Sequence, residues 1–340
     1  MLDIAVVGAG PAGLELAFRC QKKMEVVVIE EHSRVGEPSH CSGLISRNID
    51  NIAKPPKGCI EHKVKGAVFH SPGGHKLVLK KSGFAAYVID RSAFDRSLAE
   101  RLDCELLMGS RLKRIDFDAG SVTLTTGNKK IKCRVVAGAD GANSVVGSAL
   151  GAAPKEKVPG IIAIANEPNS SEFVELFFDK TLTDCFLWKI PRGESTEYGM
   201  WGAGARFDVL EKFFSIKNKS SYARRSGVIP LGPPKTYFDR AILLGDAAAM
   251  TKPWSGGGVI YGLTCAQIAA DVLMKADYSE RSLREYEIGW KRAIGKQLSA
   301  GLFMRRLYKR SSNAQIDRLM ATAKYLKLLN RLDMDFLVKK

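Results

Sequence analysis

The sequence predicts an α/β protein: a Rossmann-like nucleotide-binding domain, an interleaved antiparallel-sheet substrate domain and a helical C-terminus. Three observations support this fold class. The chain opens with a strand, a glycine-rich turn, a helix and a second strand. Aromatic-rich strands occupy its middle, and residues 281–340 have helical composition with an excess of basic side chains.

The first motif has the spacing of a dinucleotide-binding turn. Leu2–Val7 is an apolar run rich in β-branched residues, typical of a buried strand, and it leads directly into the turn. Gly8 permits a tight turn, Gly10 lets the backbone approach a pyrophosphate, and Gly13 lets the helix pack close to the sheet. The same turn includes Ala12.

The residues after the turn complete the motif. A stretch of helical composition runs from Leu14 to Lys23, and a second buried strand runs from Glu25 to Glu30. Glu30 closes that strand, where a carboxylate can accept hydrogen bonds from a ribose. The alternative is a glycine turn with a structural role only, but the flanking strand, helix and acid favour a dinucleotide site.

Composition bounds the class of protein. The chain has 340 residues, 45% of them hydrophobic, which allows one or two closely packed domains. We expect no signal peptide and no transmembrane helix, because the longest uncharged stretch, 253–270, is interrupted by three consecutive glycines. The seven cysteines are scattered without a CxxC pair, which argues against a disulfide framework and against a metal site.

The charge is strongly basic. The formal net charge is +16, and residues 275–340 contain 16 Lys and Arg against 7 Asp and Glu. This balance favours an anionic partner such as a phospholipid surface, although a solvated helical face is an equal alternative. Nucleic acid is not predicted as a partner, because no recognition motif is interleaved with the charge.

The remaining elements follow in order. We expect loop 34–43 to face the ligand, short strands over 63–88 with a hairpin turn at Gly73-Gly74, and a helix that begins after Asp90. A strand ends at Asp140-Gly141, aromatic strands fill 160–204, and 208–217 is helical. A strand at 240–244 ends in Gly245-Asp246, and a long helix opens at 253–259.

This pattern predicts a discontinuous division of the chain. The nucleotide-binding domain comprises 1–62, 84–155 and 236–280, and the sheet region that binds substrate comprises 63–83 and 156–235. Residues 281–340 form a basic helical C-terminal segment.

Four motifs in this order carry a family resemblance: the Gly8–Gly13 turn with Glu30, Asp90-Arg91, Asp140-Gly141, and Gly245-Asp246 with Gly256–Gly258. The chain resembles the glutathione-reductase-type FAD fold of flavin monooxygenases and geranylgeranyl reductases over roughly residues 1–290. The resemblance implies that FAD is the cofactor.

Two further segments resemble the geranylgeranyl reductases in particular. The loop Gly36-x-Pro38-x-x-Cys41-Ser42-Gly43 is similar to that family's signature, in which a cysteine loop lies beside the isoalloxazine. Phe186-x-Trp188-x-Ile190-Pro191 is similar to its Tyr-x-Trp-x-Phe-Pro substrate motif, with Phe for Tyr and Ile for Phe. Monooxygenases usually place Arg where this chain has Gly147, which weakens an NADPH role for Asp140.

The resemblance implies roles for matching positions. Glu30 would hold the adenosine ribose, Arg91 would contact FAD, and Leu112 would present backbone to the adenine. Asp246 would bond the ribityl chain, while Gly257, Gly258 and Val259 would offer N–H groups to the pyrimidine edge of the flavin. The remaining cofactor and substrate positions are Gly8, Gly10, Ala12, Gly13, Cys41, Ser42 and Gly43 for FAD, and Phe186, Trp188 and Pro191 for substrate.

Saturating an isoprenoid double bond needs hydride from the reduced flavin N5 and a proton from another group. Cys41 and His40 are the candidate proton-handling groups, because their loop is expected to reach the flavin. Alternatively, Cys41 only packs against the ring and His40 faces solvent. Trp188 and Phe186 line a lipid slot or form ordinary sheet core, and Asp246 can also cap a helix.

Three functions remain open at this point. The first is an FAD-dependent reductase of geranylgeranyl chains on a membrane lipid or prenylated precursor, cytoplasmic or peripheral on the inner membrane surface. The second is a flavin monooxygenase or halogenase acting on a soluble aromatic compound, and the third is an electron-transfer flavoprotein. The electron donor, whether ferredoxin, NAD(P)H or reduced flavin, is not specified by any motif.

Overall fold

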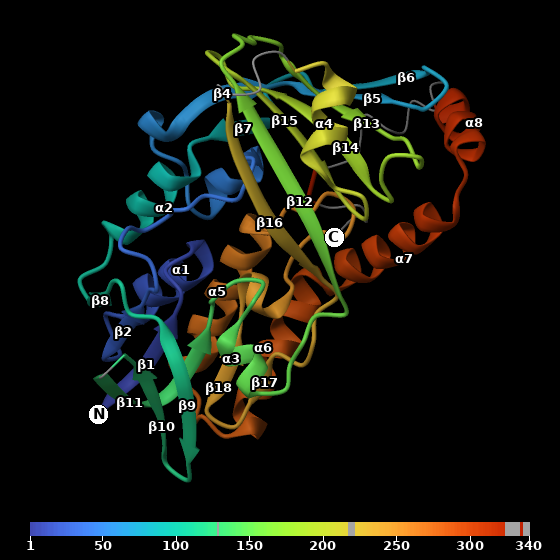
Figure 1. Cartoon of the computed structure of the whole chain (residues 1–340). Helices are drawn as coiled ribbons and strands as arrows, with labels where there is room; N and C mark the ends of the chain where they lie inside the picture. The colour runs from blue at the N-terminus through green and yellow to red at the C-terminus, as the bar shows by residue number, and fades with distance from the viewer. Residues whose placement is uncertain (128, 217–221, 324–333, 336–340) are drawn as a thin grey trace. The chain divides into compact units, whose positions relative to one another are not determined.

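The computed structural model describes residues 1–127, 129–216, 222–323 and 334–335. The chain forms two compact units, whose helices and strands are labelled in Figure 1. The first unit comprises Met1–Pro38, Ser92–Lys157 and Ile229–Ser299, and the second comprises Ser39–Arg91, Val158–Val228 and Ala300–Lys340.

A mainly parallel sheet forms the centre of the first unit. Its strand order is β17-β18-β11-β1-β2-β8, and β9 and β10 extend β11 as an antiparallel meander. The pairs β11–β1, β1–β2, β2–β8 and β11–β18 are parallel, whereas β17–β18 is antiparallel. The strands are β1 Leu2–Val7, β2 Val26–Ile29, β8 Glu105–Leu107, β9 Leu112–Asp118, β10 Ser121–Thr126, β11 Lys129–Gly138, β17 Tyr237–Phe238 and β18 Ala241–Leu243.

Burial explains why these short runs become central strands. All four residues of β2 are buried, as are Ile4 to Val7 of β1, so side chains are covered on both faces. Helices α1 and α5 pack against each other in this unit. Its helices are α1 Pro11–Cys20, α2 Arg91–Ala99, α3 Val145–Ala149, α5 Val259–Leu273 and α6 Glu280–Trp290, with a π-helical turn at Lys291–Gly295 and 3-10 turns at Gly245–Ala248.

The second unit contains a larger and a smaller sheet. The larger has the order β16-β12-β15-β14-β13-β5-β6, and the smaller has the order β3-β7-β4. The strands are β3 Leu44–Ser46, β4 Ile60–Val64, β5 Gly66–His70, β6 Lys76–Lys80, β7 Ala86–Ile89, β12 Glu156–Ala165, β13 Phe173–Phe177, β14 Phe186–Pro191, β15 Thr196–Trp201 and β16 Ala223–Leu231. The helices are α4 Phe207–Phe214, α7 Lys296–Arg310 and α8 Asn313–Ala323, with 3-10 turns at Arg47–Asn51 and Lys57–Cys59. The first four residues of α7 belong to the first unit.

Strand direction in the larger sheet differs in one place from the antiparallel arrangement expected. The pairs β12–β15, β15–β14, β14–β13 and β5–β6 are antiparallel, but β13 and β5 run parallel. These two strands come from distant parts of the chain, so no hairpin turn dictates their direction. The hairpin predicted at Gly73-Gly74 joins β5 to β6.

Each face of the larger sheet has its own apolar cluster. Leu187, Tyr198 and Met200 pack with Leu210 of α4 on one face. Ile190 packs on the other face with residues of the smaller sheet, Val64 and Val88. The alternation follows the period of two that separates the faces of a strand.

The compact units and the predicted domains divide the chain differently. Residues 39–62 and 84–91, predicted with the nucleotide-binding domain, belong to the second unit. The reason is that β3, β4 and β7 form a sheet of their own, whose Val64 and Val88 pack against Ile190 of the larger sheet.

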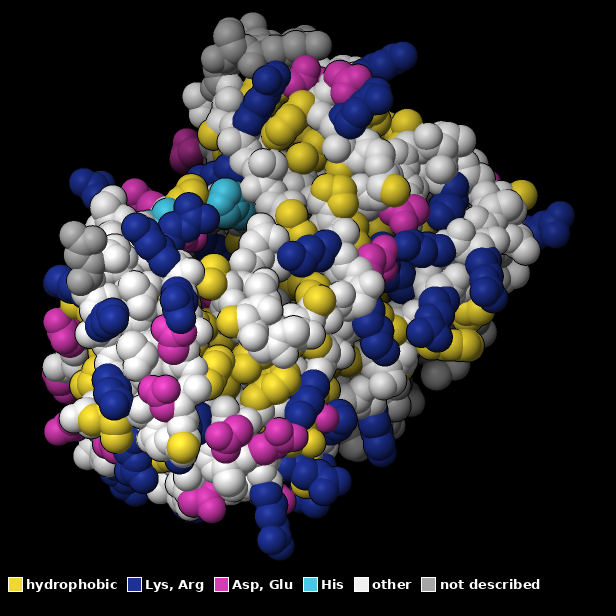
Figure 2. Space-filling model, turned by 60° about the horizontal axis from the view of Figure 1, so that its bottom comes forward, with side chains coloured by type: hydrophobic (Ala, Val, Ile, Leu, Met, Phe, Trp, Pro, Cys, Tyr) yellow, Lys and Arg dark blue, Asp and Glu magenta, His cyan; other side chains and the backbone are white. Residues whose placement is uncertain are grey.

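Basic side chains are widely distributed. Lys and Arg are scattered over the face shown in Figure 2, with Asp and Glu among them. Among the described residues, no helix combines the length and the apolarity that crossing a bilayer requires.

A pair of leucines tests the core of the second unit. Leu187 is fully buried and Leu319 of α8 is 68% exposed. We expect Leu187→Ala to lower the free energy of unfolding by about 2–5 kcal/mol, because it leaves a cavity. The matched control Leu319→Ala should change it by about 0.5 kcal/mol or less. Urea unfolding followed by circular dichroism measures both, and equal effects would contradict the assigned core.

Candidate functional site

The glycine turn of the first unit lies where β1 ends and α1 begins. Gly8 has φ +101°, a conformation that other residues avoid. A Cβ on Gly8 would lie 2.4 Å from the carbonyl oxygen of Ala139, and a Cβ on Gly13 would lie 2.1 Å from the carbonyl oxygen of Gly8. Both positions therefore exclude a side chain because backbone approaches backbone.

Gly10 differs from its two neighbours in this motif. A Cβ there would meet no protein atom within 4 Å. Its φ of −78° is one that alanine adopts without strain. The space in front of Gly10 is therefore open, as a site for a pyrophosphate requires.

Two helix N-termini in this unit have no side-chain cap. The N-cap of α1 is Gly10, followed by Pro11, and the N-cap of α5 is Gly258; neither makes a side-chain hydrogen bond. The first N–H groups of a helix have no partner within the helix, and they carry partial positive charge. Both ends can therefore receive an anionic or hydrogen-bond-accepting group.

Glu30 joins the end of β2 to the glycine turn. Its Oε2 accepts a hydrogen bond from the backbone N–H of Ala9 at 2.8 Å, and its Oε1 accepts one from the backbone N–H of His32 at 2.9 Å. His32 Nδ1 lies 2.6 Å from the same Oε1. The carboxylate thus has a fixed orientation beside the turn, and His32 is a neighbour that the motif did not predict.

Leu112 lies near Glu30 through a backbone connection. The N–H of Ser110 donates to the carbonyl of Glu30 at 2.7 Å, and β9 begins two residues later at Leu112. Leu112 is buried, with 6% of the residue exposed. An adenine contact at this backbone remains a prediction.

Asp246 and the glycine run before α5 lie together. Asp246 is exposed in the turn after β18, and a Cβ on Gly258 would lie 2.8 Å from its Oδ1. The atoms nearest to a Cβ on Gly257 would be Lys252 Cε at 3.0 Å, Lys252 Nζ at 3.3 Å and Ser255 Oγ at 3.8 Å. Val259 begins α5 directly after these glycines.

Ser255, in the same loop, carries a further sign of a ligand. Its buried Oγ has no hydrogen-bond partner within the described part of the chain. Buried hydroxyl groups are normally paired. The loop therefore fits a bound group that supplies a polar atom.

Asp140 has a structural role in the first unit. Its Oδ1 accepts from Ser144 Oγ at 2.5 Å, and its Oδ2 accepts from the backbone N–H groups of Val145 and Val146 at 2.7 and 3.1 Å. Burial raises its pKa, while these hydrogen bonds lower it. The carboxylate therefore caps α3.

The cysteine loop belongs to the second unit. Cys41 is partly exposed and His40 is exposed. The backbone N–H of Gly43 lies 3.5 Å from Cys41 Sγ as a donor. A Cβ on Gly43, at φ +70°, would lie 2.1 Å from the carbonyl oxygen of Ile89, so the end of the loop is pressed against β7.

Arg91 begins α2 and is the last residue of its segment of the second unit. Cys41, Ser42, Gly43 and Arg91 therefore stand outside the unit that holds the glycine turn, and their contact with the cofactor remains a prediction. The same applies to a role for His40 in proton transfer.

The aromatic strand β14 presents Phe186 and Trp188 on one face. The Phe186 ring is 5.5 Å from that of Trp201 and 6.2 Å from that of Trp188. Trp188 lies over Gly199 of β15, where a Cβ would be 2.0 Å from the indole. Pro191 ends the strand and is buried.

Sequence reasoning missed a buried ion pair at the end of this strand. Arg192 Nη1 lies 2.7 Å from Glu197 Oε2, and Arg192 Nη2 lies 2.7 Å from Glu61 Oε2. Burial raises the pKa of Glu197 to about 7, against the lowering effect of the Arg192 charge and the Trp188 indole N–H. The one signal from which this pair could have been predicted is the register of the β14–β15 hairpin, which places Glu197 opposite Ile190.

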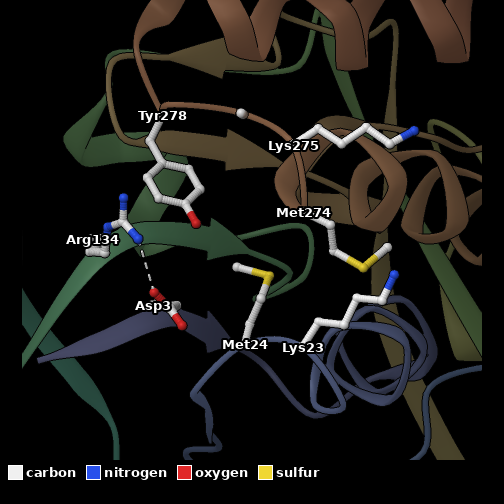
Figure 3. Close-up of a pocket in the computed structure, with 8 residues that line it drawn as sticks. Asp3, Lys23, Met24, Arg134, Met274, Lys275 and Tyr278 are labelled. Carbon is white, nitrogen blue, oxygen red and sulfur yellow. Dashed lines mark hydrogen bonds and ion pairs between the residues drawn. The ribbon is translucent and has the colours of Figure 1, made fainter.

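A surface pocket of about 350 Å³ lies elsewhere in the first unit (Figure 3). Its lining includes Asp3 near the start of β1 and Met24 before β2, together with Arg134, which pairs with Asp3 at 3.2 Å. This is the amino end of the parallel strands. Ligands of such sheets bind at the carboxyl ends, so this pocket is separate from the glycine turn.

Comparison with known proteins identifies relatives. Residues 3–157 match the family described as lycopene cyclase protein. The digeranylgeranylglycerophospholipid reductase of Methanothrix thermoacetophila is 30% identical over 355 residues, which cover 94% of this chain and 90% of the relative.

Two solved structures share the fold. A geranylgeranyl bacteriochlorophyll reductase-like protein from Thermoplasma acidophilum has a TM-score of 0.87 at 21% identity and covers 99% of this chain and 94% of its own. CmlS, a flavin-dependent halogenase, has a TM-score of 0.70 at 16% identity and covers 97% and 71%. With the family match, these findings confirm the fold class and FAD as the cofactor.

Two glycine substitutions test the cofactor site. We expect Gly10→Ala to weaken FAD binding about tenfold or more while the melting temperature of the cofactor-free protein stays unchanged, because the new methyl group meets only the ligand. Gly13→Ala should lower both the FAD affinity and the melting temperature, since its methyl group meets the Gly8 carbonyl. FAD titration and thermal unfolding separate the two effects, and a Gly10→Ala protein with normal affinity would argue against the site.

Proposed function

The chain belongs to the digeranylgeranylglycerophospholipid reductase family and is an FAD-dependent oxidoreductase, and on that basis we propose that it saturates geranylgeranyl double bonds of a membrane lipid or its prenylated precursor. One observation carries the choice of substrate. The cysteine loop and the aromatic strand are directly connected, because Arg192, next to the strand, donates to the carbonyl of Ser42 at 2.7 Å.

The residues of the chain divide the work of this reaction. Bound FAD supplies the reducing equivalent from its reduced ring. The Gly10 and Gly258 helix ends and Glu30 hold the cofactor, and Asp246 offers a carboxylate to its ribityl chain. The partly exposed Trp188 offers an apolar surface to the isoprenoid chain and excludes water from it, and the buried Phe186 ring packs against the indole.

Cys41 is the candidate that delivers the proton from its Sγ. It is partly exposed, whereas burial raises the pKa of Cys20, Cys133 and Cys185 to about 12 each. Those three thiols are therefore poorly placed to exchange protons with a ligand. His40, the exposed residue beside Cys41, is the second candidate.

The halogenase alternative receives less support. The likeness to CmlS is a likeness of fold at 16% identity. A halogenase Gly-Trp-x-Trp-x-Ile-Pro segment would need Gly and Trp where this chain has Cys185 and Phe186. An electron-transfer role would leave the aromatic strand without a ligand.

An anaerobic assay tests the proposal. FAD-loaded protein is reduced with dithionite and mixed with a geranylgeranylated glycerophospholipid, and flavin reoxidation and product mass are followed. We expect a gain of two hydrogens per saturated bond. Cys41→Ala should lower the rate in FAD-saturated protein about 10²- to 10⁴-fold, as loss of a general acid does.

A matched control is Cys104→Ala, since Cys104 is also partly exposed but lies in the first unit before β8. It should leave the rate unchanged. Reduced protein that ignores the lipid, yet oxygenates or halogenates an aromatic compound when given oxygen, would contradict the reductase assignment.

A lipid substrate also calls for a membrane-facing surface, and we assign this to α7. Its outer side exposes Phe303, Met304 and Leu307, at 59%, 46% and 52%, and the neighbouring Arg306 and Arg310 are exposed. Phe303 and Leu307 are one helical turn apart. An apolar stripe flanked by cations complements an anionic phospholipid surface, the partner that the basic C-terminal segment favours.

Vesicle flotation tests this surface. With vesicles of phosphatidylglycerol and phosphatidylcholine, Phe303→Ser/Leu307→Ser should weaken binding on the order of tenfold, because two apolar side chains are lost. The matched control is Phe117→Ser/Val78→Ser, two residues that are 41% and 52% exposed on strands. Equal binding of the two variants would exclude α7 as the docking surface.

A further inference from the structure

Arg192 lies at the centre of a buried network in the second unit. Arg192 follows directly after the last residue of β14, and its side chain is 5% exposed. Nη1 donates to the carbonyl of Ser42 at 2.7 Å and to Glu197 Oε2 at 2.7 Å. Nη2 pairs with Glu61 Oε2 at 2.7 Å and donates to the carbonyl of Ile89 at 3.4 Å.

These contacts hold the cysteine turn from two sides. The Arg192 guanidinium donates hydrogen bonds to the carbonyl of Ser42 and to the carbonyl of Ile89. Gly43 lies directly against the same Ile89 carbonyl. The N–H of Gly43 points at Cys41 Sγ at 3.5 Å. The orientation of the peptide between Ser42 and Gly43 therefore sets the position of the thiol.

Glu197 connects the same guanidinium to the aromatic strand. Its side chain has no exposed surface, and its Oε1 accepts from Trp188 Nε1 at 2.8 Å. The indole also packs against the backbone of Gly199, where a Cβ would lie 2.0 Å from its ring. One carboxylate thus fixes the indole with one oxygen and Arg192 with the other.

The planar fork of arginine suits this task. Guanidinium presents several N–H donors in fixed directions, whereas the ammonium of lysine is a single point. A buried ion pair often adds little net stability over apolar residues of the same volume. A role in geometry accounts for its place between two motifs better than a role in stability does.

From this arrangement we infer that Arg192 and Glu197 are positioning residues that lock the Cys41 turn and the Trp188 indole into one arrangement for double-bond reduction. The inference rests on the proposed function for its effect on rate. The arrangement itself is measurable without any turnover.

The pair also gives the arrangement a dependence on pH. The charged groups that face Glu197 are Arg192 and, at longer range, Arg225 of β16, and Glu61 of β4 faces Arg192. Because burial raises the pKa of Glu197 to about 7, the ion pair is complete only above neutral pH. Since the folded carboxyl keeps its proton at a higher pH than the unfolded one, its contribution to stability falls as pH rises from about 4.5 to about 7.

Three variants test the inference. Glu197→Gln removes the charge and keeps the size, Arg192→Lys keeps the charge and removes the fork, and Glu211→Gln is the control. Glu211 is likewise buried and paired with an arginine, Arg224 at 2.7 Å, but it belongs to α4 rather than to the cysteine loop or to β14.

Two readouts need no substrate. We expect Glu197→Gln and Arg192→Lys to raise the alkylation rate of Cys41 by iodoacetamide about fivefold or more, as measured by peptide mass spectrometry, because the turn is released. The near-ultraviolet circular dichroism of tryptophan should change as well. Glu211→Gln should match the wild type in both, and unchanged Cys41 alkylation in the first two variants would overturn the inference.

The third readout is steady-state reduction of the lipid. Glu197→Gln should lower kcat about 10- to 100-fold with KM and FAD affinity within about threefold. Because the ion pair is complete only above neutral pH, we also expect wild-type kcat to rise with pH near 7, and this rise should be missing in Glu197→Gln. Retained kcat with an unchanged pH profile would overturn the inference. Wild-type protein that binds FAD but never reduces the lipid would overturn the proposed function instead, and the alkylation rates would still decide whether the pair holds the turn.

Discussion

The close approach of backbone to backbone at the end of β1 is the constraint on which the first unit depends. With no side chain at Gly8 or Gly13, α1 starts directly behind the strand, and its first turn has no side-chain cap. Glu30 can then reach the Ala9 amide from the end of the next strand. The carboxyl ends of the parallel strands therefore collect a helix end, a carboxylate and, from far along the chain, Asp246 with the glycines before α5.

Much of this unit could be read from local patterns. Gly8, Gly13 and Glu30 have roles that follow from spacing within thirty residues, and the strand, turn and helix around them are visible as short runs. Helix and strand ends shifted by a few residues, as for α1, because Pro11 at its first position favours an early start. Gly10 was predicted as the point of ligand approach, and only the structure distinguishes its open space from the crowding at Gly8 and Gly13.

The contacts of the second unit could not be predicted from local sequence patterns, for a physical reason. Arg192 contacts residues of four segments that are distant in the sequence: Ser42, Glu61, Ile89 and Glu197. No local sequence pattern predicts such contacts. The parallel pairing of β5 with β13 is similarly long-range. The fold shared with a flavin-dependent halogenase covers 97% of this chain, so both units belong to a fold that serves more than one chemistry.

The seat of Trp188 on Gly199 has a consequence for the history of this sheet. The indole occupies the volume that any larger residue at position 199 would need, and the two positions face each other across an antiparallel pair. Neither position can be substituted independently. A side chain at 199 would displace the indole, and loss of the indole would leave the backbone of β15 uncovered. The two positions are therefore sterically coupled, and a larger residue at 199 is compatible with this strand pair only if position 188 changes with it.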